Sequence, residues 1–236
     1  MREGEPMALP CPLPPVIFFD AVGTLLFPEP SPSEVYAAVG RRFGSRVDAS
    51  TVASRFSVAF LRQEGEDIAS GLRTSEAREL ARWRAIVAEV LDDVSDAEAC
   101  FQTLYAHFAR SSAWRCAEDA AEVLDALSAR GHSVGIASNF DRRLRPLVEN
   151  LPSLRAVRSL VISSEVGWRK PAAAFFEAMC RSIHAPAQQI LYVGDDLAND
   201  FEGASAAGMQ ALLLDPRRIA PSVQNHRIES LRALLS

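Results

Sequence analysis

Five short apolar runs recur along the chain and alternate with segments of helical periodicity. The first run, residues 16–19, is Val-Ile-Phe-Phe, which is typical of a strand buried on both faces of a parallel sheet. The other runs span residues 133–137, 160–163, 190–193 and 211–214. Helical patterns lie between them at residues 117–130, 142–150, 172–183 and 200–207. This alternation predicts an α/β fold built on a doubly wound parallel sheet.

The segment between the first and second runs has a different character. No convincing strand pattern occurs in it, and amphipathic helices are expected at residues 33–43, 49–64, 75–91 and 96–110. We therefore expect a helical insertion, residues 28–112, that covers the carboxyl edge of the sheet. The α/β core then comprises residues 15–27 and 113–236, and the proline-rich residues 1–14 are expected to form a loose tail.

Composition narrows the classes of partner. With 48% hydrophobic residues in 236, the chain can bury enough apolar surface to fold as a globular protein. Its 25 basic and 30 acidic residues give a net charge of −5, which argues against nucleic acid or an anionic membrane as partner. The longest apolar stretch, residues 16–27, is too short to span a bilayer, and no signal peptide is evident. We expect a cytoplasmic protein that acts on a small molecule.

Acidic side chains gather where the predicted strands end, which is where ligands bind in open α/β sheets. Asp20 follows the first strand, and Asp195 and Asp200 follow the fourth. Three neighbouring carboxylates repel one another unless a cation neutralises them. Because Mg²⁺ prefers oxygen ligands and often binds carboxylates together with a substrate phosphate, we expect a Mg²⁺ site here.

Other polar residues near the predicted strand ends are suited to bind an anion. Only one of the 25 basic residues is a lysine, Lys170, and a compact ammonium with three donors fits a phosphate oxygen in a tight pocket. Ser138, at the end of the second strand, adds a hydroxyl. A carboxylate beside Mg²⁺ can attack phosphorus and form an aspartyl-phosphate.

In this order the motifs resemble those of the haloacid dehalogenase (HAD) superfamily of hydrolases. Residues 20–24 resemble its first motif, Ser138 its second, Lys170 its third and residues 194–200 its fourth. The finer sequence features are similar to a subgroup that includes HAD domain-containing protein 3 and rhythmically expressed insect relatives. The resemblance implies a HAD-like Rossmannoid core with a helical cap inserted after the first strand, and a phosphatase-type activity on a small phosphorylated metabolite.

The resemblance also implies a role for each residue. Asp20 would be the nucleophile and a Mg²⁺ ligand, Asp195 a direct ligand, and Asp200 would hold metal-bound water. The remaining ligand in the family is the main-chain carbonyl two residues after the nucleophile, here that of Val22.

The phosphoryl oxygens would be bound by three further residues. They are Ser138, Asn139 and Lys170. Lys170 would in addition orient Asp20, whereas Thr24 is expected to be mainly structural and Asp196 has no expected role.

Val22 departs from the phosphatase pattern, in which an aspartate at this position is the general acid for the leaving group. General acid catalysis contributes ~10²–10⁴-fold, so we expect slow turnover of alkyl phosphates. Two alternatives follow. One is a metal-independent 2-haloacid dehalogenase, which would need a cap arginine such as Arg41, Arg42 or Arg62. The other is a non-catalytic descendant that binds a phosphometabolite or a protein.

Overall fold

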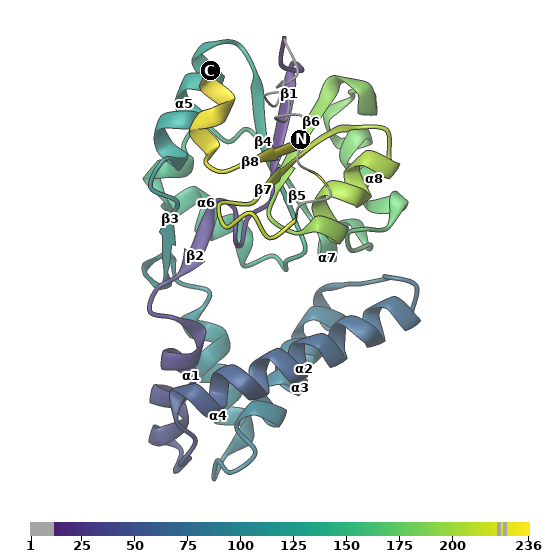
Figure 1. Ribbon diagram of the computed structural model, residues 1–236. Helices are drawn as coiled ribbons and strands as arrows, with labels where there is room; N and C mark the ends of the chain where they lie inside the picture. The colour runs from purple at the N-terminus through teal and green to yellow at the C-terminus, as the bar shows by residue number, and fades with distance from the viewer. Residues whose placement is uncertain (1–11, 221–222, 224–225) are drawn as a thin grey trace, which may run out of the picture.

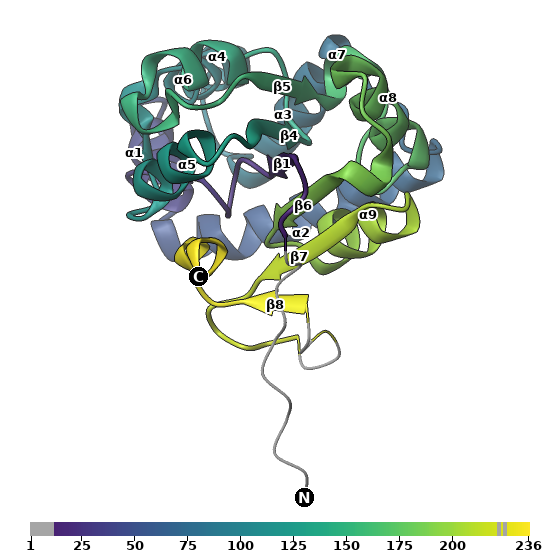
Figure 2. The ribbon, with the colours of Figure 1, turned by 90° about the horizontal axis from the view of Figure 1, so that it is seen from above.

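The computed structural model describes residues 12–220, 223 and 226–236, so most of the predicted tail lies outside the described residues. A six-stranded parallel sheet in the order β5-β4-β1-β6-β7-β8 forms its centre (Figures 1 and 2). The strands are β1 (Val16–Phe19), β4 (Ser133–Ser138), β5 (Ser159–Ile162), β6 (Ile190–Gly194), β7 (Gln210–Leu214) and β8 (Arg227–Ile228). The predicted fold class and five predicted strands are confirmed. β8 was not predicted, because two residues carry no periodicity.

Helices cover both faces of the sheet, and the alternation of side chains along β1 shows why. Ile17 and Phe19 pack on one face against α5 (Ala120–Ala129), whereas Phe18 packs on the other against α8 (Ala173–Ile183). The remaining core helices are α6 (Leu144–Asn150), α7 (Ser163–Val166) and α9 (Gly203–Ala206). Short turns of helix are η1 (Ser111–Ala113), η2 (Pro152–Leu154), η3 (Ala187–Gln189), the π-helical η4 (Leu197–Glu202) and η6 (Leu231–Leu235). Within the described ranges, no helix is both long and apolar enough to cross a membrane.

Four helices, which we call the cap, form a separate layer beside the core (Figure 1). They are α1 (Pro32–Arg42), α2 (Ala49–Ala69), α3 (Glu76–Val90) and α4 (Ala97–His107). Each begins after a side chain that accepts a hydrogen bond from the first turn: Ser31, Asp48, Ser75 and Asp96. The cap has its own apolar core, which includes Tyr36, Val52, Ile86 and Phe101.

α2 runs five residues beyond the end at residue 64 that the apolar periodicity predicts. Its last turns bury polar side chains instead, and Asp67 accepts hydrogen bonds from Arg78 and Arg82 of α3. An ion-pair cluster therefore continues the packing after the apolar pattern stops. Apolar periodicity cannot show such an extension.

A short antiparallel ribbon connects the core with the cap. It pairs β2 (Leu26–Pro28) with β3 (Trp114–Cys116) (Figure 1). The sequence did not predict this ribbon, because its strands have three residues each and one contains a proline. Pro28, which was assigned to the helical insertion, thus lies in the ribbon.

A second contact holds the far end of the cap against the core. The Thr74 amide donates to the Gly167 carbonyl at 3.1 Å, and the guanidinium of Arg169 pairs with Glu79 and Asp67. Gly167 is the C-cap of α7 and has φ +86°, and the chain continues from it to Arg169 and Lys170. Because this segment leads into Lys170, the cap is anchored beside the predicted site.

Candidate active site

The carboxyl ends of β1, β4 and β6 meet at the edge of the sheet that faces the cap. Phe19 is in register with Ile136 of β4 and Val193 of β6, and the Asp20 amide donates to the Val193 carbonyl at 2.9 Å. Asp20 therefore lies between the ends of β4 and β6. The buried Ser138 is the last residue of β4, and Asp195 directly follows β6.

Three carboxylates come together at this edge. Asp20, Asp195 and Asp200 each offer an oxygen, and these oxygens all lie within 4.8 Å of one another. Asp20 and Asp200 are buried, whereas Asp195 is exposed. Oxygen donors at this spacing, with more negative charge than one lysine can balance, fit a small divalent cation such as Mg²⁺.

Two glycines in the predicted motifs make this close approach possible. Gly23 has φ +96°, and a Cβ added to it would overlap the Asp195 carboxylate. A Cβ on Gly194 would overlap Asp200 in the same way. Any larger residue at either position would displace a carboxylate of the cluster.

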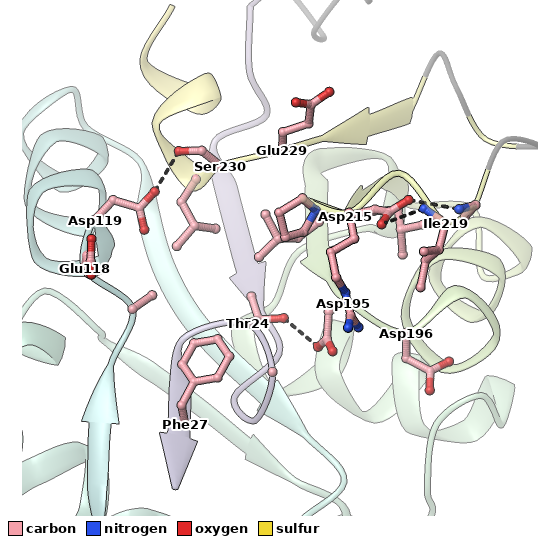
Figure 3. A pocket seen from close by; sticks show the side chains of 18 of the residues that line it. Thr24, Phe27, Glu118, Asp119, Asp195, Asp196, Asp215, Ile219, Glu229 and Ser230 are labelled. Atoms are coloured by element: carbon pink, nitrogen blue, oxygen red, sulfur yellow. Dashed lines mark hydrogen bonds between the residues drawn. The ribbon is translucent and has the colours of Figure 1, made fainter. Parts of the chain in front are cut away.

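Local hydrogen bonds orient the two carboxylates of the cluster that follow β6, those of Asp195 and Asp200. The Thr24 hydroxyl donates to Oδ1 of Asp195 at 3.0 Å, so Thr24 contacts the cluster directly (Figure 3). The Asp196 amide donates to Oδ2 of Asp200 at 3.0 Å. The Asp196 side chain caps η4 by accepting from the amides of Ala198 and Asn199, which gives this exposed residue a structural role.

Lys170 lies at the centre of the buried part of the site. Its Nζ donates to Asp20 Oδ1 and Asp200 Oδ1, each at 2.6 Å, and to the Tyr192 hydroxyl at 2.9 Å. Burial alone would lower the pKa of Lys170, but the charges of Asp20 and Asp200 outweigh it and raise this pKa well above its usual value. The side chain is therefore a cation that balances part of the acidic cluster.

Two positioning contacts of Lys170 could not be assigned from the sequence. Tyr192, inside β6, donates to the Ala137 carbonyl and accepts from Lys170. Its signal is a single tyrosine in the aliphatic run Ile-Leu-Tyr-Val. Asn139, predicted to bind substrate, uses both ends of its amide on the Lys170 backbone, at 2.7 and 3.0 Å.

Burial, together with the charge of Asp20, raises the pKa values of two carboxylates in the cluster. Removal of water by the surrounding chain raises the pKa of Asp195 to about 6, and the negative charge of Asp20 adds to this effect. Burial also raises the pKa of Asp200 above its usual range, against the opposing charge of Lys170. A divalent cation would relieve both effects.

On one side of Asp195 the site opens into a groove of about 1050 Å³ along β7 (Figure 3). Several acidic side chains that line it are already bonded within the core. Asp215 accepts from the amides of Ile219 and Ala220, and Asp119 accepts from the Ser230 hydroxyl. The groove thus gives access to Asp195, and three arginines, Arg115, Arg217 and Arg232, also line it.

The structure also places Val22 and the arginines considered for a dehalogenase. The Val22 side chain is partly exposed and lines an apolar cavity between core and cap. Arg41 and Arg42 line a different surface pocket, on the cap, beside Asp48 and His107. Arg62 is exposed and pairs with Glu89. No contact in the described part of the chain joins these three arginines to the acidic cluster.

Similarity to known proteins agrees with this geometry. The family model of the haloacid dehalogenase-like hydrolases matches residues 14–208. The chain is 29% identical to human haloacid dehalogenase-like hydrolase domain-containing protein 3, over 93% of this chain and 92% of that protein.

Two solved structures show the same fold. One is a HAD-hydrolase of Bacillus subtilis bound to magnesium, with TM-score 0.71 and 16% identity over 94% of this chain and 97% of that one. The other is an L-2-haloacid dehalogenase with TM-score 0.72 and 18% identity, over 94% and 97%. Since the family match covers most of the chain, including every strand that contributes to the acidic cluster, this protein belongs to the haloacid dehalogenase-like hydrolases.

Proposed function

We propose that this hydrolase is a Mg²⁺-dependent phosphatase that acts on a small phosphorylated metabolite through an aspartyl-phosphate on Asp20. One observation carries the proposal. Asp20, Asp195 and Asp200 meet within 4.8 Å, and Lys170 donates to two of them. This arrangement suits a bound cation that lets an anionic phosphoryl group approach Asp20, since the substrate would otherwise meet unbalanced carboxylates.

The Mg²⁺ would be held by the carboxylates of Asp20, Asp195 and Asp200 and by the Val22 carbonyl. When bound, it would neutralise negative charge on the phosphoryl oxygens. The Thr24 hydroxyl and the Asp196 amide keep two of these carboxylates in place.

The reaction itself uses groups of the chain. A carboxylate oxygen of Asp20 attacks phosphorus, the bond from phosphorus to the leaving oxygen breaks, and that oxygen keeps the electron pair. Lys170 holds the other oxygen of Asp20, which restricts rotation of the carboxylate. Ser138 and Lys170 would bind the transferred group, while Asn139 keeps the Lys170 backbone in position. Water then hydrolyses the acyl phosphate and restores Asp20.

Val22 sets the expected substrate scope. Without a carboxyl at this position, the leaving oxygen departs without a proton from this residue. Phenolate and acyl leaving groups tolerate this, whereas alkoxides do not. Turnover should therefore be slow for sugar and glycerol phosphates.

Phosphate release from p-nitrophenyl phosphate, with Mg²⁺ and with EDTA, tests the proposal. We expect hydrolysis only with Mg²⁺, and its loss in the Asp195→Asn variant. Hydrolysis that is equal with Mg²⁺ and with EDTA would contradict the proposed metal site.

One observation favours a second candidate, a metal-independent 2-haloacid dehalogenase, because an apolar residue at Val22 suits a reaction that needs no general acid. The acidic cluster argues against it, since a haloacid carboxylate would meet Asp195 and Asp200 without a cation. Chloride release from 2-chloropropionate in EDTA distinguishes it from a phosphatase. A descendant that only binds would show phosphate binding but neither reaction.

A further inference from the structure

An apolar cavity of about 340 Å³ lies between core and cap. Val22 forms part of its wall, and aromatic side chains form most of the rest. Four of them come from three cap helices: Tyr36 of α1, Phe56 and Phe60 of α2, and Trp83 of α3. The others are Phe108, Trp114 and Phe140. Phe56, Phe60 and Trp83 are only half-buried, so their rings leave apolar surface open to the cavity.

The rings form one connected wall. Phe56 meets Tyr36 edge to face with centroids 5.6 Å apart, lies parallel to Phe60 at 6.0 Å, and is tilted against Trp83 at 6.4 Å. Aromatic rings in such arrangements position one another and present a rigid apolar surface. The cavity thus has a defined shape that suits a further ring.

The charged side chain in this wall, that of Arg143, is already neutralised. Its Nε and Nη2 donate to the buried Asp141 at 2.8 and 2.7 Å, and its guanidinium carbon lies 3.7 Å from the centroid of the Tyr105 ring. Nη1 donates to the Tyr105 carbonyl at 3.3 Å. The cavity therefore does not offer a free cation to a second phosphate or to a carboxylate of a substrate.

Two short stretches of chain connect the wall of the cavity with the proposed site. Val22 is two residues beyond Asp20, and Asn139, which also lines the cavity, follows Ser138. A phosphoryl group held by Ser138 and Asp20 would leave the rest of its substrate facing this wall. The aromatic cavity is thus positioned to receive the leaving group.

We infer that the leaving group of the physiological substrate is uncharged and apolar, carries a ring, and binds in the cavity formed by Tyr36, Phe56, Phe60 and Trp83. This inference rests on the proposed phosphatase function. It excludes bisphosphates and carboxylated phosphates as preferred substrates. Pockets of ~300 Å³ and above are of the size that binds small organic ligands, so one or two rings fit the volume.

Binding of two phosphonates in the presence of Mg²⁺ tests the inference without turnover. Calorimetry with benzylphosphonate and methylphosphonate compares the same anionic group with and without a ring. We expect benzylphosphonate to bind at least ~10-fold more tightly, because its ring leaves water for an aromatic wall. Equal affinities would overturn the assignment of the cavity.

A pair of variants on one helix locates the effect. Phe56→Ala should weaken benzylphosphonate binding by ~10-fold and leave methylphosphonate binding unchanged. Leu61→Ala is the matched control, because Leu61 is 66% exposed on α2 and does not line the cavity. Equal losses for both ligands in Phe56→Ala, or the same loss in both variants, would contradict a ring subsite at Phe56. The wild-type comparison remains decisive if Phe56→Ala does not fold.

Turnover supplies an independent measurement. Benzyl phosphate and ethyl phosphate both release alkoxides of weakly acidic alcohols. A higher kcat/KM for benzyl phosphate would therefore indicate binding of the ring and not a better leaving group. The two proposals fail in different ways. If neither phosphonate binds, the anion site is wrong and the proposed function fails with it. If both bind equally, the function stands and only the apolar subsite is refuted.

Discussion

The core and the cap of this hydrolase place their functional side chains by different kinds of contact. In the core, parallel strand register and hydrogen bonds fix Asp20, Lys170 and Asp200, and Lys170 donates to both carboxylates at 2.6 Å. In the cap, half-buried rings such as Phe56 and Trp83 are held by contacts with one another. The core site is polar and internally bonded, whereas the cap presents an apolar surface.

This difference separates chemistry from selectivity. A change in the bonded core network should reduce turnover of every phosphate ester by a similar factor, since all share the phosphoryl group. A change in the cap wall should alter the ratio between substrates, since only the leaving group reaches it. The following variants test this division from the core outward.

The largest effect is expected for Asp20→Asn, which removes the proposed nucleophile. The amide cannot form the acyl phosphate, so activity should fall ~10⁴-fold or more for aryl and alkyl substrates alike. Phosphate release at equal folded fraction measures this. Asp196→Asn is the matched control, because asparagine can still cap η4, and it should remain close to wild type. More than ~1% residual activity in Asp20→Asn would contradict its role.

Much of this core arrangement could be predicted from the sequence, because strand order and motif position determine it. Asp20, Asp195 and Asp200 follow apolar runs that are recognisable without a structure, and the structure brings all three together. Lys170 stands out in the composition as the single lysine of the chain, and it contacts Asp20 and Asp200. Tyr192 was missed, since a tyrosine in a buried strand is compatible with ordinary packing.

The sequence predicts the helices of the cap but not their arrangement. The N-terminal capping residues and the apolar periodicity of each helix are local features, so the four helices were expected near their observed positions. Trp83 lies in the amphipathic helix predicted at residues 75–91, and the structure places it both against the cap core and in the cavity wall. The relative placement of α1, α2 and α3 determines which rings remain open, and no local pattern encodes it.

The second variant, Lys170→Arg, keeps the charge in the core but changes its shape. Lys170 is 3% exposed, and its Nζ donates to two carboxylates, a hydroxyl and a main-chain carbonyl, an arrangement that a larger planar guanidinium cannot reproduce. We expect activity to fall ~10²–10³-fold, the cost of losing a well-positioned donor in an active site. Turnover near the wild-type level in steady-state assays would show that only the charge matters.

The third variant, Val22→Asp, lies at the boundary between the two regions and should change the ratio between substrates. A carboxyl there would stand at the position of the family's general acid. The gain should reach ~10²-fold for glycerol phosphate and be smaller for p-nitrophenyl phosphate, whose leaving group needs no proton. Rates must be compared at equal folded fraction. An equal change for both substrates would contradict the missing-acid interpretation.

The smallest effect concerns stability and returns to the charge of the core. The pKa of Asp195 is raised from about 3.8 to about 6 in the folded protein, so between these values the folded state keeps a proton that the unfolded chain has released. In EDTA, this residue's contribution to stability should therefore fall as the pH rises from 4 to 6 and stay low above that. Asp200, whose pKa is also raised, acts in the same direction.

Magnesium should reverse this loss, because it binds the ionised carboxylates of the folded state. At ten times its Kd, a ligand stabilises by ~1.4 kcal/mol, which for a chain of this size raises Tm by ~3–6 °C. The increment should be larger at pH 8 than at pH 5, since binding at pH 5 must first displace protons. Thermal unfolding of the wild type, Asp195→Asn and the control Asp196→Asn at both pH values measures it. Asp195→Asn should lose most of the Mg²⁺-dependent increase in Tm and most of its pH dependence. An unchanged response would place the cation elsewhere. The charge argument that joins Asp20, Lys170 and Asp200 into one site would then fail.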